Sequence, residues 1–135
     1  MKPTEQNGFM EAWKRSKPFL VTALKKGTYG GYDIDDLWAM INDGRAIFYP
    51  VQNGAAVFRV EVYPHTRRLA FWLIGGEVGD GRAKLDAVVE AAEFLAKEHE
   101  CDGIELIGQK GWERVLKPYG YKHKGVVLTK ERGGD

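Results

Sequence analysis

The feature that most constrains the fold is an apolar run, residues 69–74, followed by a glycine-rich loop and a long amphipathic segment. The run LAFWLI has no polar alternation, which is typical of a strand covered on both faces. Four of the chain's 17 glycines fall within residues 75–81, directly after it. Over residues 83–100, apolar side chains recur at helical spacing with charged residues between them. This segment therefore predicts a buried strand, a tight loop and a helix packed on the sheet.

The residues before this unit predict two helices. Helical periodicity covers residues 9–26, where Pro18 predicts either a bend or a division into two short helices. Asp33 is placed to cap the second helix, and Gly44 is placed to end it. The expected strands that follow this helix are joined by short connections.

The remaining strands are indicated by short apolar or alternating runs, and Asn53-Gly54 is a strong hairpin signal between two of them. They are expected at residues 46–50, 58–62, 103–108 and 121–130, with a short helix at residues 111–119. Counted along the chain, the first three strands are those at residues 46–50, 58–62 and 69–74, and their tight connections make them antiparallel. The long helix allows a parallel crossover to the fourth, at residues 103–108. We expect one α/β (α+β) domain over residues 1–135, with a mixed sheet, helices on both faces and a frayed tail at residues 131–135.

Composition excludes several classes of protein. The chain has 135 residues, of which 44% are hydrophobic and 29% charged, as in one folded domain. Twenty Lys and Arg nearly balance 19 Asp and Glu, with an acidic middle between two basic ends. No basic helix, zinc-finger spacing or RNA-binding aromatic motif accompanies those ends, so we expect no nucleic-acid partner.

The sequence also indicates where such a protein works and which groups it lacks. Cys101 is the lone cysteine, and we find neither a secretory signal nor an apolar stretch long enough to cross a membrane. We expect a cytoplasmic protein. His65, His99 and His123 have no acidic ligand at metal-binding spacing, so we assign no metal.

The loop after the apolar run is the segment best suited to chemistry. A strand, glycines and a helix N-terminus together favour binding of a phosphate, because the backbone can approach closely and unpaired N–H groups face the anion. The loop has no Gly-Lys-Ser/Thr and does not match the dinucleotide fingerprint. The glycines alternatively serve only to turn the chain.

The order of elements resembles the GNAT acetyltransferase superfamily. In that family the strand before the long helix contacts the pantetheine arm of acetyl-CoA, and a Gln/Arg-x-x-Gly-x-Gly/Ala loop holds the pyrophosphate. Gly79 and Gly81 match this loop, whereas Gly76 replaces its Gln or Arg and the loop carries Glu77 and Asp80. Gly120-Tyr121 looks like the Gly-Phe that follows the family's last helix.

The resemblance implies which residues carry the activity. The backbone of Leu73 and Ile74 would hold pantetheine, and the N–H groups of Gly79, Gly81 and Arg82 would hold the pyrophosphate of acetyl-CoA. Counting along the motif places Gln109 where many members have an asparagine, and Leu116 where many have a tyrosine general acid. Water or the amine itself would then protonate the thiolate.

Two strand glutamates are candidates for the base that accepts a proton from the amine. Glu61 and Glu105 each lie on an expected strand, and a partly buried carboxylate can take this role. The alternative is that both only form the polar face of a half-covered strand. The acceptor would be a small-molecule or protein amine.

A second hypothesis is a non-catalytic protein. The segments Asp43-Gly44-Arg45-Ala46 and Gly111-Trp112-Glu113-Arg114 are similar to segments of short GNAT-like phage and prophage proteins. That resemblance implies contacts with phage structural proteins in virion assembly, and a virion-associated location. The acidic loop and Leu116 favour this hypothesis, whereas the retained glycines favour the enzyme.

Overall fold

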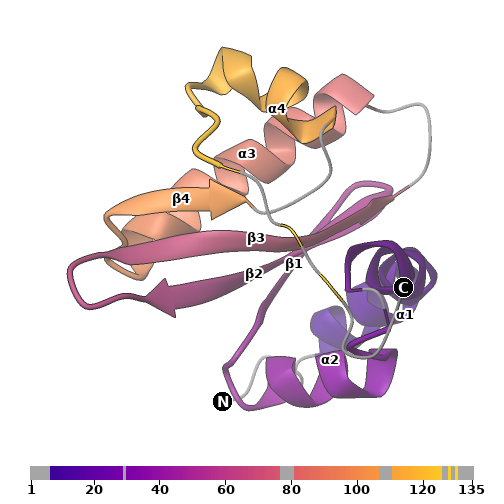
Figure 1. Ribbon diagram of the computed structural model, residues 1–135. Coiled ribbons are helices and arrows are strands. Elements are labelled where there is room, and N and C mark those ends of the chain that lie inside the picture. Colours follow the sequence, from indigo (N-terminus) through magenta and orange to yellow (C-terminus); the bar gives the residue numbers. More distant parts are fainter. Residues whose placement is uncertain are drawn as a thin grey trace.

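A four-stranded sheet forms the centre of the protein, and helices cover both of its faces (Figure 1). This computed structural model describes residues 7–28, 30–76, 81–106, 111–125, 128 and 130. The elements, in chain order, are α1 (Asn7–Gly27), α2 (Ile34–Asn42), β1 (Ile47–Val51), β2 (Gly54–Val62), β3 (Arg67–Gly76), α3 (Gly81–Glu98), β4 (Gly103–Leu106), α4 (Gly111–Leu116) and the 3₁₀ helix η2 (Lys117–Tyr119).

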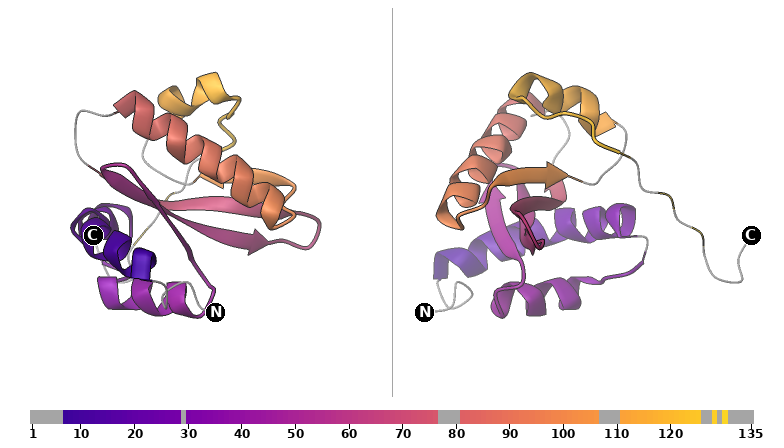
Figure 2. Two further views of the ribbon diagram at one scale, coloured as in Figure 1. Left: turned by 180° about the vertical axis from the view of Figure 1, so that it is seen from behind. Right: turned by 60° about the vertical axis from the view of Figure 1, so that its left-hand side comes forward.

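The sheet has the order β1-β2-β3-β4, in which β1–β2 and β2–β3 pair antiparallel and β3–β4 pair parallel. Helices α1 and α2 lie on one face, and α3 and α4 lie on the other (Figure 2). The expected α/β fold with a mixed sheet, a parallel crossover and helices on both faces is therefore confirmed.

The two N-terminal helices form where the sequence predicts them. Helix α1 is a single helix with Pro18 inside it. At the start of α2, the Asp33 carboxylate accepts from the Asp36 N–H at 2.9 Å, and the Asp36 carboxylate accepts from the Asp33 N–H at 2.9 Å. This reciprocal pair satisfies two backbone donors that a helix start leaves open. Gly44 follows the helix end with φ +84°, which a glycine adopts without strain.

Strand β3 lies between β2 and β4 and contributes to the core on both faces of the sheet. Leu73 packs in the cluster with α1 and α2, whereas Leu69 and Phe71 pack in the cluster with α3. Residues 69–74 are all buried or half-buried, so the uninterrupted apolar run fits a strand that packs on both faces.

The expected strand at residues 121–130 is wrong for the residues that the structure describes there. Residues 121–125, 128 and 130 are not in a strand. Tyr121 packs against the core, but residues 122–125 are exposed and Leu128 is 88% exposed. The described residues 122–125 and 128 bury no side chain against the sheet, so they gain nothing from joining it. None of the described helices is both long and apolar enough to cross a membrane.

Candidate functional site

Strand β3 extends well beyond its partner β4. Only Arg68–Phe71 of the ten-residue strand pair with β4, and the last pair is Phe71 with Leu106. In an antiparallel pair, alternate residues direct their N–H and C=O groups away from the partner strand. Along residues 72–76, those groups face an edge that no described strand covers. Among the residues that the structure describes, this part of β3 therefore offers a row of hydrogen-bonding groups with no partner strand.

A β-bulge in the pairing of β2 with β3 lies at the point where β3 and β4 stop pairing. Phe71 pairs with Phe58 and Leu73 pairs with Val57, so Trp72 is an extra residue on β3. A bulge bends its strand and increases the local twist. The bulge is thus a physical reason for β3 to diverge from β4 after Phe71.

Leu73 and Ile74, the predicted pantetheine residues, lie on this free segment. Their side chains are engaged in packing, because Leu73 belongs to the cluster that includes Leu20 and Leu37, while Ile74 packs against the cluster that includes Val88. A ligand could therefore meet only backbone groups here, and strand alternation turns the N–H and C=O of only one of these two neighbours toward the open edge. Ligand binding itself stays a prediction.

The predicted pyrophosphate residues are described only in part. Gly79 lies outside the described residues, as do Glu77, Asp80 and Gln109. Gly81 and Arg82 are the first two residues of α3, where backbone N–H groups have no acceptor within the helix. Their backbone position suits an anion, and binding of the pyrophosphate there stays a prediction.

Glu105 is the centre of a polar cluster on the sheet face that carries α1 and α2. The Tyr63 hydroxyl donates to both of its carboxylate oxygens at 2.8 and 3.0 Å, and the Arg68 guanidinium lies 3.9 Å away. The Glu105 side chain is only 18% exposed. The hydrogen bond from Tyr63 to Glu105 raises the pKa of that tyrosine, since its ionisation would place two negative charges together.

Glu61, the other candidate base, lies on β2 across from Arg68 but forms its ion pair with a different arginine. Its side chain is 37% exposed, and it lies 3.6 Å from the Arg59 guanidinium. The structure thus distinguishes the two glutamates: Glu105 is enclosed and oriented, whereas Glu61 is open to water.

The sequence analysis missed Tyr63 and Arg68 as partners of Glu105. Tyr63 follows Glu61 by two residues, so strand alternation is a signal that both side chains leave the same face. The contact with Glu105 spans 42 positions of sequence and depends on the register of three strands, which no local pattern shows.

Trp72, the bulge residue, carries an aromatic and cationic cluster on the same face. The Arg59 guanidinium lies over its ring at 5.1 Å, and the Tyr32 ring meets it edge-on with centroids 4.9 Å apart. Such contacts stabilise by about 0.5–1.5 kcal/mol each. They connect the loop between α1 and α2 to the point where β3 diverges.

The GNAT tyrosine general acid has no counterpart at Leu116, and two tyrosines lie nearby in the sequence. Leu116 is 3% exposed and belongs to the core, so no hydroxyl is present there. Tyr119 is hydrogen-bonded to Asp86 and connects η2 to α3. The Tyr121 hydroxyl is buried, has no hydrogen-bond partner in the described part of the chain, and lies on a ring 6.1 Å from that of Phe71. Burial raises the pKa of Tyr121 to about 12.

Among the residues described, no group of three or more His, Cys, Asp and Glu side chains is arranged to hold a metal ion. The chemistry available on this face therefore comes from a carboxylate, guanidinium groups, tyrosine hydroxyls and unpaired backbone.

Comparison with solved structures finds a similar fold in several acetyltransferases. The chain superposes on a Trypanosoma brucei acetyltransferase with a TM-score of 0.61 at 7% identity, covering 74% of this chain and 78% of that one. A predicted acetyltransferase from Clostridium acetobutylicum, solved with acetyl-CoA, gives 0.60 at 17% identity, covering 75% and 77%. A probable acetyltransferase gives 0.61 at 11% identity, covering 83% and 87%.

The fold is that of the GNAT acetyltransferases. At these identities the likeness shows the fold alone. No family model and no curated protein matches the sequence. Nothing in the comparisons supports the resemblance to phage and prophage proteins, which stays a prediction.

Proposed function

We propose that this protein transfers an acetyl group from acetyl-CoA to an amine. The observation that carries the proposal is the free edge of β3 along residues 72–76, which begins at the bulge where β3 and β4 stop pairing. The pantetheine arm of acetyl-CoA contains amides, which can pair with free backbone N–H and C=O groups as an added strand does.

The residues present fit this cofactor. Of Leu73 and Ile74, the one whose backbone faces away from β2 supplies N–H and C=O groups for the pantetheine arm, while the side chains of both fix the strand between two cores. Gly81 and Arg82 supply N–H groups at the start of α3 for the pyrophosphate, where the helix dipole favours an anion. Acetyl-CoA, when bound, supplies the acetyl group as an activated thioester.

Glu105 is the better candidate for the base, because it is the more enclosed and the better oriented of the two glutamates. Its carboxylate accepts the proton that the amine loses as the amine nitrogen forms its bond to the acetyl carbon. Tyr63 acts as a positioning residue, holding both carboxylate oxygens. Since Leu116 has no hydroxyl, the departing thiolate takes its proton from water or, when the amine enters protonated, takes the second of the two protons that the amine loses.

The acceptor is a small-molecule or protein amine that approaches the face with Trp72 and Glu105. We place the reaction in the cytoplasm, where the half-buried thiol of Cys101 stays reduced.

Calorimetric titration with acetyl-CoA, paired with thermal unfolding, tests the proposal. Binding to the folded state alone at a hundredfold excess over Kd adds about 2.7 kcal/mol of stability. Backbone amide shifts should concentrate in residues 72–76 and at the start of α3. Neither heat nor stabilisation at millimolar acetyl-CoA would reject the enzyme and favour a GNAT-like protein that acts through protein contacts.

Gly81→Pro sharpens this test. Proline is tolerated at the first position of a helix, yet it removes one N–H donor. We expect weaker acetyl-CoA binding with an unchanged far-ultraviolet spectrum. Gly111→Pro makes the same exchange at the first residue of α4 and should bind acetyl-CoA as the parent does. Equal loss in both variants would mean that the pyrophosphate does not lie on α3.

A further inference from the structure

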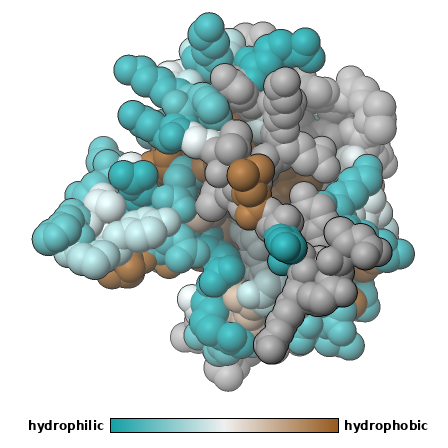
Figure 3. Space-filling model, in the orientation of Figure 1, coloured by the Kyte–Doolittle hydropathy of each residue, from teal (hydrophilic) through white to brown (hydrophobic). Residues whose placement is uncertain are grey.

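A second open edge exists on the other side of the sheet. The last pair between β1 and β2 joins Ile47 to Phe58, so Arg59–Val62 continue without a described strand on that side. A concave pocket of about 390 Å³ lies over this edge, with Ile47 and Val60 in its wall. This volume is within the range of small-molecule sites. In Figure 3 the end of the β2–β3 hairpin projects to the left, and the outline is indented below it.

The lining of this pocket is strongly cationic. Arg45, Arg59 and Arg67 line it together with His99. No Asp or Glu is among the described residues that line the pocket. The three arginines come from three different segments, so their convergence is a product of the fold rather than of a basic run in the sequence.

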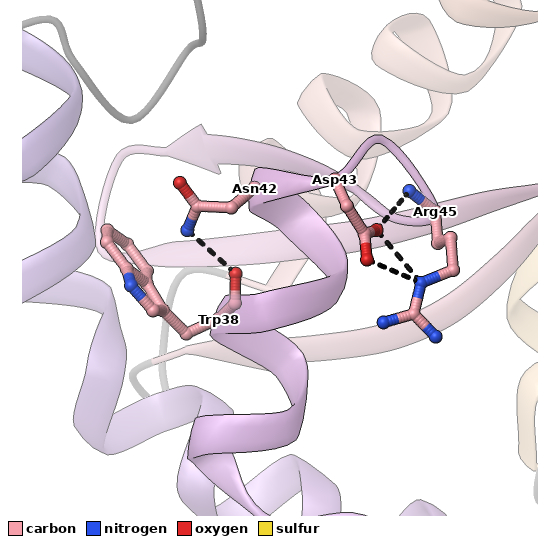
Figure 4. A network of polar contacts seen from close by, with 4 residues as sticks. All are labelled: Trp38, Asn42, Asp43 and Arg45. Atoms are coloured by element: carbon pink, nitrogen blue, oxygen red, sulfur yellow. Dashed lines mark hydrogen bonds and ion pairs between the residues drawn. The ribbon is translucent and has the colours of Figure 1, made fainter.

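Arg45 and Arg59 each retain capacity for a further partner. Asp43 contacts the Arg45 Nε through its two carboxylate oxygens at 2.8 and 2.9 Å (Figure 4), and this hydrogen bond lowers the pKa of Asp43. A guanidinium has five N–H donors, so contact at Nε leaves others available. Arg59 meets Glu61 only at 3.6 Å, beyond hydrogen-bond distance.

Arg67 is the arginine whose charge is least compensated. Its Nε donates to the His99 carbonyl at 2.8 Å, a neutral acceptor near the end of α3. This bond fixes the side chain but does not neutralise it, and in the part of the chain that the structure describes no carboxylate forms an ion pair with it. The pocket thus contains an oriented guanidinium that has no carboxylate partner among the described residues.

We propose that this pocket binds the carboxylate or phosphate group of a small organic anion, held by Arg45, Arg59 and Arg67. Guanidinium groups bind both anions through paired hydrogen bonds, which a lysine cannot reproduce. Tyr32, Ile47 and Val60 supply a mostly apolar wall for the rest of the ligand. The site does not depend on acetyl transfer.

Titration of the ¹⁵N-labelled full chain with orthophosphate, and separately with citrate, tests this proposal at constant ionic strength. The Nε–Hε signals of Arg45, Arg59 and Arg67 should shift and saturate together. The tighter of the two probes identifies the phosphate or carboxylate class. Shifts that stay linear, or that are equally large at the exposed Arg15 of α1, would overturn the proposal.

Matched variants complete the test. Arg59→Gln and Arg67→Gln should each weaken the better probe about tenfold or more, since a hydrogen bond to a charged group contributes about 1.5–3 kcal/mol. Arg15→Gln, on exposed α1 surface, should bind as the parent does. Two arginine variants are used because Arg67→Gln also removes the bond to the His99 carbonyl. Unchanged affinity in both would refute the site.

Discussion

Gly75 is the position where a single methyl group should test the packing of the candidate cofactor strand. A Cβ added there would lie 2.6 Å from the Phe19 carbonyl oxygen and 3.1 Å from the Phe19 Cβ. The nearest atom belongs to the backbone of α1, which cannot rotate away as a flexible side chain can. Gly75→Ala must therefore push α1 and β3 apart.

The magnitude follows from two opposing effects. Overpacking of a tight interior typically destabilises by about 1–3 kcal/mol. Replacing a glycine also restricts the unfolded chain, which stabilises by about 0.4–1 kcal/mol. The expected result for Gly75→Ala is a net loss of about 1–2 kcal/mol in the free energy of unfolding. Gly103, on β4, is the matched control, because a Cβ there meets nothing within 4 Å. Gly103→Ala should be neutral or slightly stabilising.

Urea unfolding followed by tryptophan fluorescence measures both variants. A lower midpoint with an unchanged slope would show lost stability rather than a changed unfolded state. If Gly75→Ala unfolds at the parent's midpoint, α1 does not contact β3 as described, and the reasoning fails. A large loss in Gly103→Ala would show that the effect reflects glycine replacement in general.

Three further predictions follow from the same structure. Asp33→Ala should lower stability by about 0.5–2 kcal/mol in urea unfolding, because it removes the reciprocal cap of α2; no change would mean that the cap is absent in solution. Tyr121→Phe should raise stability by about 1 kcal/mol, since its buried hydroxyl lacks a partner among the described residues. The parent holds a proton that its unfolded chain releases between pH about 10 and about 12, so its stability should fall across that window more steeply than the variant's. Glu105→Gln should lower the pKa of Tyr63 toward its ordinary value in an ultraviolet titration, because the hydrogen bond to the carboxylate is the largest cause of the raised pKa; an unchanged titration would place the two side chains apart.

Local patterns in the sequence were sufficient for most elements of the fold. The Asp33 cap, the Asn53 turn with φ 61° and the apolar run of β3 each depend on neighbouring residues, and each is present in the structure. The expected C-terminal strand was wrong for the described residues 121–125, 128 and 130, because alternation along a segment says nothing about whether a partner edge exists. Such an edge is a property of the assembled sheet.

The candidate site was less accessible to sequence reasoning for the same reason. The glycine-rich loop and the two glutamates carry local signals, but the divergence of β3 from β4 does not. It depends on the bulge at Trp72, which is seen only when the pairing with Val57 and Phe58 is known. The cationic pocket likewise depends on β1 beginning only at Ile47, because Arg59–Val62 of β2 then have β3 on one side and no described strand on the other.

Arg59 lies at both proposed sites, the cationic pocket and the open edge of β3. Its position indicates which kind of acceptor such an acetyltransferase would take. Its guanidinium lines the cationic pocket and also lies over the Trp72 ring, at the bulge where the free edge of β3 begins. Arg59 and Glu105 lie on the same face of the sheet, on strands separated by β3 alone. With strands about 4.8 Å apart, that places their backbones roughly 10 Å apart across the sheet. An amine bound at Glu105 whose molecule also carries a carboxylate or phosphate could span that distance.

If both proposals hold, anionic amines should therefore be acetylated faster than neutral amines of the same length, and Arg59→Gln should remove that preference while leaving acetyl-CoA binding intact. An equal preference in parent and variant would show that the pocket serves a ligand other than the acceptor.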